Sequence, residues 1–195
     1  MPYSTAEADA PNESTASFCD PDRPDLFYHL FEAPTPISAS VPVFALSFLP
    51  DPPHDVQSDT VIGWLPAGTP ADTDAADGAG LNDFQENDKF HALLQEAVRS
   101  ALADGTDYVQ INSALQTQQG WMHIHDNRNI PALGRIGDPD DILGSVRVED
   151  GQILPETYQP MPSYRLCTSD GIVQLTEGIA QRLRELLEAR AAEGR

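Results

Sequence analysis

The sequence predicts an α+β fold, a largely antiparallel sheet of about six or seven strands with two long helices packed on one face. Residues 88–103 and 177–192 repeat apolar side chains at three- and four-residue spacing, as amphipathic helices do. Short runs of β-branched and aromatic residues, separated by turn residues, favour strands joined by hairpins. The length of 195 residues suits one domain with flexible margins.

The amino-terminal part of the chain divides by composition. Residues 1–25 are rich in Ser, Thr, Ala, Pro and Asp, and this predicts a disordered acidic arm. Residues 26–192 are then expected to form a single α+β domain. Its first segment, residues 26–31 (LFYHLF), is interpreted as a short helical turn capped by Asp25 that docks on the domain; the alternative is a linear motif for a partner. An acidic stretch at about residues 66–87 has no periodicity and predicts a mobile loop.

The strands are predicted from alternating or continuous apolar runs. They are expected at residues 41–49, 60–65, 108–115, 121–125, 141–149, 151–156, 164–168 and 172–175. Residues 108–115 alternate in polarity, and we expect them to pair with 121–125 as an antiparallel hairpin. A second hairpin should turn at Asp150-Gly151 or at Glu149-Asp150.

The two helices carry recognisable end signals. Asn87 or Asp88 can cap the helix at 88–103, and Asp104-Gly105 provides a stop. Thr176 is the expected cap of the helix at 177–192. With hairpins before and between these helices, we expect most strand pairs to be antiparallel.

The charge balance limits the classes of partner. The chain has 31 acidic and 11 basic side chains, a net charge of −20. Nucleic acid and anionic membrane are therefore not expected as partners, since phosphate binding needs clustered Lys and Arg. Neither a signal peptide nor an apolar run of membrane-spanning length is evident. These features predict a cytoplasmic, possibly also nuclear, protein.

Two histidines suggest a possible metal site. His123 and His125 are separated by one residue, so on a strand their imidazoles share a face, and Asp126 follows directly. A metal site generally needs a third or fourth ligand, and no further His lies downstream. The alternative is a polar sheet face on which the histidines form hydrogen bonds. No cofactor is expected.

Four arginines form the second candidate site, a possible anion-binding site. They are Arg128, Arg135, Arg147 and Arg165. Arginine binds carboxylate or phosphate in a planar, bidentate manner. The alternative is internal ion pairing with the interleaved acidic residues. Asp138-Pro139-Asp140-Asp141 lacks the glycine and distal glutamate of a calcium loop, so a turn or cap is the interpretation there.

The carboxy-terminal part resembles a known family. Residues 134–187 contain a Gly-Arg, an Asp-Pro-x-Asp-Ile, a Gly-Ser-Val hairpin, a Tyr-Arg-x-x-Thr strand, an Asp-Gly-Ile and a terminal helix. This pattern is similar to the signature of a family of small, uncharacterised fungal proteins. The resemblance implies a fungal intracellular protein and no particular activity, cofactor or catalytic residue.

The functional hypothesis follows from incomplete catalytic patterns. There is no Gly-x-Ser-x-Gly elbow and no glycine-rich phosphate loop. We therefore expect a non-enzymatic protein-interaction or assembly factor with a protein partner. The alternative is a small-molecule binding protein or enzyme that binds an anion or a metal through the His123, His125, Asp126 and arginine group.

Overall fold

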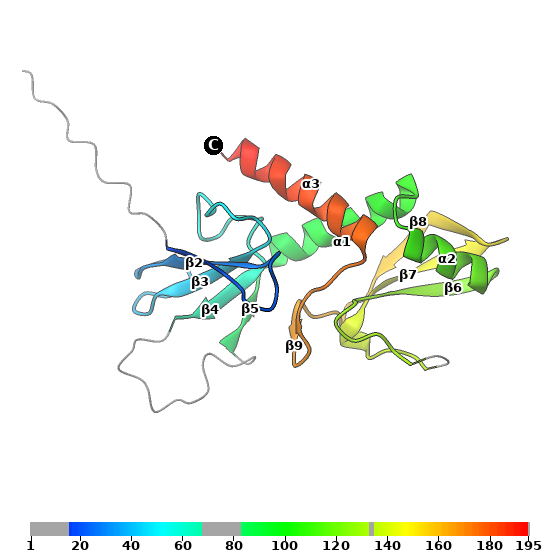
Figure 1. Ribbon diagram of the computed structural model, residues 1–195, viewed down its shortest axis with the longest axis horizontal. Coiled ribbons are helices and arrows are strands. Elements are labelled where there is room, and N and C mark those ends of the chain that lie inside the picture. Colours follow the sequence, from blue (N-terminus) through cyan, green and yellow to red (C-terminus); the bar gives the residue numbers. More distant parts are fainter. Residues whose placement is uncertain (1–15, 68–82, 133–134, 195) are drawn as a thin grey trace, which may run out of the picture.

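The computed structural model describes residues 16–67, 83–132 and 135–194. Two antiparallel sheets lie at opposite ends of the molecule, and two long helices run between them (Figure 1). These helices, α1 (Asp88–Asp104) and α3 (Glu177–Glu193), pack against each other. The α+β class with antiparallel strands is confirmed, but the arrangement differs from the single sheet that the sequence predicted.

The larger sheet has five strands in sequential order. They are β1 (Ser17–Cys19), β2 (Phe27–Phe31), β3 (Val43–Ser47), β4 (Gly63–Pro66) and β5 (Gln85–Glu86). The helical turn predicted at residues 26–31 is wrong, because this segment forms β2. It pairs with β3 along its whole length and with β1 on its other edge. Pairing on both sides satisfies the backbone of a short apolar run, whose own pattern does not separate helix from strand.

The predicted flexible segments lie partly outside the described residues. Residues 1–15 of the expected arm are among those not described, whereas β1 places Ser17–Cys19 in the sheet. The disordered arm expected over residues 1–25 therefore does not extend across this strand. Of the expected loop at 66–87, residues 68–82 are likewise outside the description, and Gln85–Glu86 form β5.

Helix α1 follows the prediction at both ends. The Asn87 side chain accepts a hydrogen bond from the Lys89 N–H. The helix ends at Gly105, whose φ of 62° is in the left-handed region that glycine adopts freely. The long helix at the carboxy-terminal end is also confirmed, as α3.

A third helix was missed. Residues 108–115, predicted as a strand, belong to α2 (Tyr108–Thr117). The cause is Asp107, whose carboxylate accepts hydrogen bonds from the N–H groups of Val109 and Gln110 and so starts a helix. Gln110 and Ala114 lie one turn apart and are the buried residues of α2. The short polar alternation of residues 108–115 predicted a strand, but the Asp107 cap starts a helix there.

Asp107 also joins α2 to α3. Its second carboxylate oxygen accepts hydrogen bonds from the Thr176 hydroxyl and from the Ile179 N–H, the latter at 3.0 Å. Thr176 does occupy the cap position of α3, yet its own hydroxyl makes no capping bond to that helix. Gly178 permits this approach, because a Cβ there would lie 2.5 Å from the Thr106 carbonyl oxygen.

The smaller sheet has three strands. They are β6 (Gly120–His125), β7 (Ile142–Glu149) and β8 (Gln152–Pro160), in the order β6-β7-β8. The β7–β8 hairpin turns at Asp150 and Gly151, with φ of 50° and 72°, as one of the predicted alternatives required. Strand β6 pairs with β7 and not with residues 108–115. A separate ribbon contains β9 (Cys167–Thr168) and β10 (Gly171–Ile172), shorter than the strands predicted there.

One continuous core connects these parts. It joins residues of α1 and α3 with residues of both larger sheets, including Leu46, Phe90, Val146 and Leu183. The other face of the five-stranded sheet has a small cluster of its own around Trp64. The helices therefore pack between sheets, and the prediction of two helices on one face of one sheet was wrong. None of the described helices is long and apolar enough to cross a membrane.

Candidate functional site

The two histidines lie on edge strand β6. Trp121 and His123 are exposed, while Met122 and Ile124 on the opposite face are buried. The ring centroids of His123 and His125 are 6.2 Å apart. Nδ1 of His123 is 2.7 Å from the Ser145 hydroxyl on the neighbouring strand β7. The structure thus brings the two imidazoles together and gives one of them a hydrogen-bond partner.

His125 has a buried nitrogen without a partner. Its Nε2 makes no hydrogen bond within the part of the chain that the structure describes. A Cβ at Gly137 would lie 3.0 Å from the Cδ2 atom of His125, so the loop backbone closes over the ring. Burial lowers the pKa of His125, the neighbouring His123 lowers it further, and Asp141 opposes the shift. The geometry favours a neutral imidazole.

Asp126 forms its hydrogen bonds with other segments of the chain and not with the two histidines. Its side chain is fully buried and accepts a hydrogen bond of 2.7 Å from the Tyr164 hydroxyl. The N–H groups of Arg128 and Gln174 donate to its Oδ1 at 2.9 and 3.1 Å. Burial raises the pKa of Asp126, while the Arg128 charge and these hydrogen bonds oppose the shift. Its oxygens therefore hold three loop segments together, and metal binding by His123, His125 and Asp126 stays a prediction.

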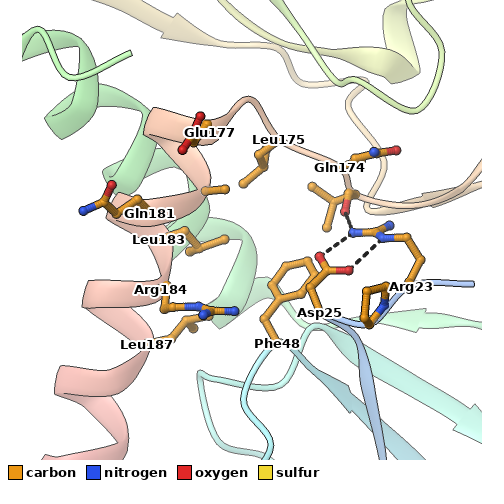
Figure 2. A pocket seen from close by; sticks show the side chains of 13 residues that line it. Arg23, Asp25, Phe48, Gln174, Leu175, Glu177, Gln181, Leu183, Arg184 and Leu187 are labelled. Atoms are coloured by element: carbon orange, nitrogen blue, oxygen red, sulfur yellow. Dashed lines mark hydrogen bonds and ion pairs between the residues drawn. The ribbon is translucent and has the colours of Figure 1, made fainter. Parts of the chain in front are cut away.

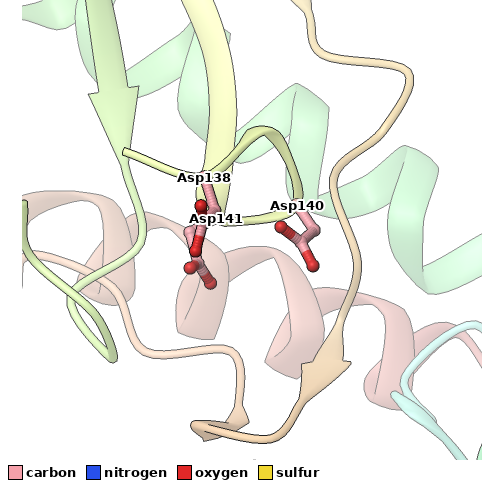
Figure 3. Close-up of side chains that lie close together, drawn as sticks. All are labelled: Asp138, Asp140 and Asp141. Carbon is pink, nitrogen blue, oxygen red and sulfur yellow. The ribbon is translucent and has the colours of Figure 1, made fainter. Parts of the chain in front are cut away.

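Three carboxylates gather at the turn before β7. Among the described residues, Asp138, Asp140 and Asp141 are the one group of three or more ligand-type side chains whose oxygens lie within 4.8 Å of one another (Figure 3). The 3₁₀ turn Pro139–Asp141 carries two of them. Asp141 is already engaged, with Oδ1 accepting from Arg128 Nε at 2.8 Å and Oδ2 from Asn129 at 3.2 Å. This matches the turn interpretation.

Arg128 is the centre of a buried polar node, which consists of Asp126, Arg128, Asp141 and Tyr164. Its side chain is 1% exposed. Beyond the Asp141 contact, its guanidinium donates to the carbonyls of Asp140, Arg165 and Leu166, and lies 3.6 Å from Asp126. Burial opposes its charge, but the carboxylates of Asp126 and Asp141 outweigh this and raise the pKa of Arg128. Its N–H donors are thus directed to internal acceptors.

The other three arginines do not share this environment. Arg147 is 53% exposed on β7 and lies 3.4 Å from Glu149. Arg165 contributes its backbone to the buried polar node while the residue is exposed, and Arg135 is exposed in the loop. Arg128 therefore contacts the backbone of Arg165, whereas Arg147 pairs separately with Glu149. Anion binding by this set stays a prediction.

An exposed apolar surface was missed by the sequence reasoning. The described chain has eight large hydrophobic residues that are substantially exposed, and four of them come from α2 and β6. We call these the α2–β6 surface: Tyr108 (79% exposed), Val109 (54%), Leu115 (53%) and Trp121 (53%). Residues 108–125 contain no Asp, Glu, Lys or Arg in a chain of net charge −20. That uncharged stretch is the signal from which the surface could have been found.

Comparison of the chain with protein family models, with curated proteins and with solved structures finds no match. The function is therefore inferred from the contacts, burial and charge of its own residues.

Proposed function

We propose that this chain is a non-enzymatic interaction protein that binds a partner protein through the α2–β6 surface. The observation that carries the proposal is the exposure of these four apolar side chains on two successive, contacting elements. Apolar area removed from water stabilises an association by roughly 25 cal/mol per Å².

The elements themselves support an interface. Helix α2 buries Gln110 and Ala114, which leaves much of its apolar content outside the core. Strand β6 is at the edge of its sheet, so part of its backbone is available for pairing. Tyr and Trp are the residues that most often dominate binding energy at protein interfaces.

The charge distribution indicates the kind of partner. The four residues of the α2–β6 surface are uncharged, with the exposed Arg147 opposite Trp121 on β7, while the chain as a whole carries a net charge of −20. A partner with an apolar contact region and a basic rim would bury few charges at the centre of the interface. The net negative charge of the chain would attract it from a distance. We therefore expect a basic protein partner, with association that slows as salt is added.

The alternative of catalysis has less support from the contacts. Among the groups with acid–base or anion-binding chemistry, Asp126 and Arg128 are buried and hydrogen-bonded to other parts of the chain. A substrate would have to displace those bonds. The resemblance to the fungal family and the cytoplasmic or nuclear location stay proposals that add no residue to the site.

The decisive experiment compares variants of matched chemistry. Wild-type chain and the double variant Tyr108→Asp/Leu115→Asp are used as baits in quantitative affinity capture from lysate. Ile136→Asp is the control, because Ile136 is 80% exposed but lies outside the α2–β6 surface. We expect a basic protein captured by the wild type and by the control, and not by the double variant. Its affinity, measured with purified protein, should also fall with Trp121→Ala.

Two results would overturn the proposal. One is capture of the same proteins in equal amounts by all three baits. The other is concentration-dependent self-association of the wild type, measured by light scattering, that the double variant abolishes; the occupant of the surface would then be a second copy.

A second candidate function rests on the buried Nε2 of His125, which has no partner among the described residues and lies on the same strand as His123. A divalent metal could use both imidazoles. Calorimetric titration with Zn²⁺ tests this. Micromolar binding that His125→Ala and His123→Ala each abolish would support a metal site, and heats equal to the buffer blank would exclude it.

A further inference from the structure

A cavity of about 540 Å³ lies between α3, the residues that follow β3 and the segment that connects β1 to β2 (Figure 2). This volume is within the range of small-molecule sites, roughly 300–1,000 Å³. The cavity is remote in sequence from the α2–β6 surface and does not depend on the proposed function. None of the arginines or histidines considered above lines it.

One wall of the cavity is apolar. Phe48 comes from the residues after β3, and Leu183 and Leu187 come from successive turns of α3. All three belong to the main core, and Leu183 and Leu187 are only 1% and 0% exposed. Val173 and Leu175 continue the wall along the segment that leads into α3. The apolar area that a ligand body could contact comes from Leu175, which is half-buried, and from the exposed Pro24 and Ala180.

The charged groups at the cavity are unequal. Asp25 accepts two hydrogen bonds from the Arg23 guanidinium, at 3.0 and 2.9 Å, and Arg23 also donates to the carbonyls of Ile172 and Val173. The hydrogen bonds from Arg23 lower the pKa of Asp25, burial opposes this shift, and the charges of Arg23 and Arg184 lower the pKa further. The Arg23–Asp25 pair holds one side of the cavity in place, and both of its side chains are already hydrogen-bonded.

Arg184 differs from Arg23. It is exposed on α3, and Figure 2 shows its side chain directed toward Phe48. No hydrogen bond or ion pair to Arg184 is found among the described residues. The other acidic group, Glu177, precedes it by seven residues, about 10 Å along the helix axis. The Arg184 charge also acts on Asp25, so two guanidinium groups at the cavity, those of Arg23 and Arg184, share this one carboxylate.

We propose that this cavity binds a small monocarboxylate with an apolar body. The Arg184 guanidinium would hold the carboxylate through two parallel N–H···O bonds. The body would lie against Pro24, Leu175 and Ala180. A phosphate ester fits less well, because its second negative charge would meet the Asp25 carboxylate with no further free cation beside it.

The test uses octanoate as the probe and calorimetry as the readout. We expect saturable binding to the wild type, with 1-octanol, which has the same body and no charge, binding at least tenfold more weakly. Arg184→Gln should weaken octanoate binding about 10- to 100-fold, the effect of one charge-assisted bond pair. Arg190→Gln is the control, since Arg190 is on the same helix but does not line this cavity.

The outcomes separate the alternatives. Equal affinity for octanoate and octanol would mean an apolar cleft without anion recognition, and it would overturn the proposal. So would equal octanoate affinity in Arg184→Gln and wild type, or no binding at millimolar octanoate. The thermal midpoint of each variant, which should match the wild type because both arginines are exposed, shows that the fold is intact.

Discussion

The buried polar node and the α2–β6 surface distribute polar and apolar side chains in opposite ways. In the node, Asp126 and Arg128 have side chains 0% and 1% exposed and form a dense set of hydrogen bonds. On the α2–β6 surface, Tyr108 and Trp121 are 79% and 53% exposed. Burial of charge is costly unless it is paired, and exposure of apolar area is costly unless something covers it.

The node and the α2–β6 surface differ in which side chains are free to act on another molecule. The carboxylates and the guanidinium of the node form hydrogen bonds that connect residues 126–128 and 140–141 with the segments at Tyr164 and Gln174. The four residues of the α2–β6 surface keep at least half of their surface area exposed after folding. The node is therefore expected to control stability, and the α2–β6 surface to control binding.

The largest effect should come from removing the cation of the node. Arg128→Met leaves the Asp126 and Asp141 carboxylates buried without their counter-charge, and we expect a loss of about 3–5 kcal/mol in the free energy of unfolding. Urea denaturation measures this. Arg147→Met is the matched control and should change stability by less than about 0.5 kcal/mol.

The origin of that loss can be checked by adding Asp126→Asn and Asp141→Asn to Arg128→Met. These changes remove the uncompensated charges, so part of the lost stability should return. Equal losses of unfolding free energy in Arg128→Met and Arg147→Met would show that the buried arginine contributes no more to stability than an exposed one does.

A smaller effect is expected at the helix junction. Asp107→Ala removes hydrogen bonds to the starts of both α2 and α3, and each helix cap is worth about 1 kcal/mol, so we expect a loss of about 2 kcal/mol. Asp107→Asn keeps an acceptor oxygen and should lose less. Equal losses in the two variants would show that the carboxylate charge, and not capping geometry, holds the junction.

The pH dependence tests a buried polar group outside the node. His29 is fully buried, with Nδ1 near the Ser17 hydroxyl and Nε2 near the Leu49 carbonyl oxygen. Burial lowers its pKa, against the opposing influences of the Leu49 carbonyl and Asp51. Because the unfolded chain then binds the proton more readily, its stabilising contribution is complete above the ordinary pKa of about 6.5 and is lost as the pH falls through the lowered value.

We therefore expect the urea midpoint of the wild type to decrease between pH 7 and pH 5. In His29→Gln this decrease should be smaller, since the titrating group is gone. An NMR titration of the His29 ring provides the direct measurement. Identical pH profiles for the two proteins would contradict the assignment.

The smallest effect on stability is expected on the α2–β6 surface. Tyr108→Asp/Leu115→Asp should change the free energy of unfolding by no more than about 0.5 kcal/mol, because both side chains are more than half exposed. Thermal and urea unfolding provide the check. A loss of several kcal/mol would mean that these side chains contribute to the core, and the same variant could not then report on binding.

Several features could be read from the sequence because they depend on local chemistry. The apolar spacing at 88–103 and the Asn87 cap predicted α1, and Asp150-Gly151 predicted the turn of the β7–β8 hairpin. The His123–His125 pair was correctly expected to share a strand face. In each case the decisive interactions lie within a few residues of chain, so the local pattern contains them.

Other features depended on partners far along the chain. Residues 27–31 became a strand because β1 and β3 pair with both of their edges, and residues 108–117 became a helix capped by an aspartate that also contacts α3. The acidic balance, α1 and α3 and the positions of the candidate residues were determined by the sequence itself. Tertiary contacts enclose Arg128 and leave Arg184 exposed, because burial depends on which segments converge and not on the identity of the residue.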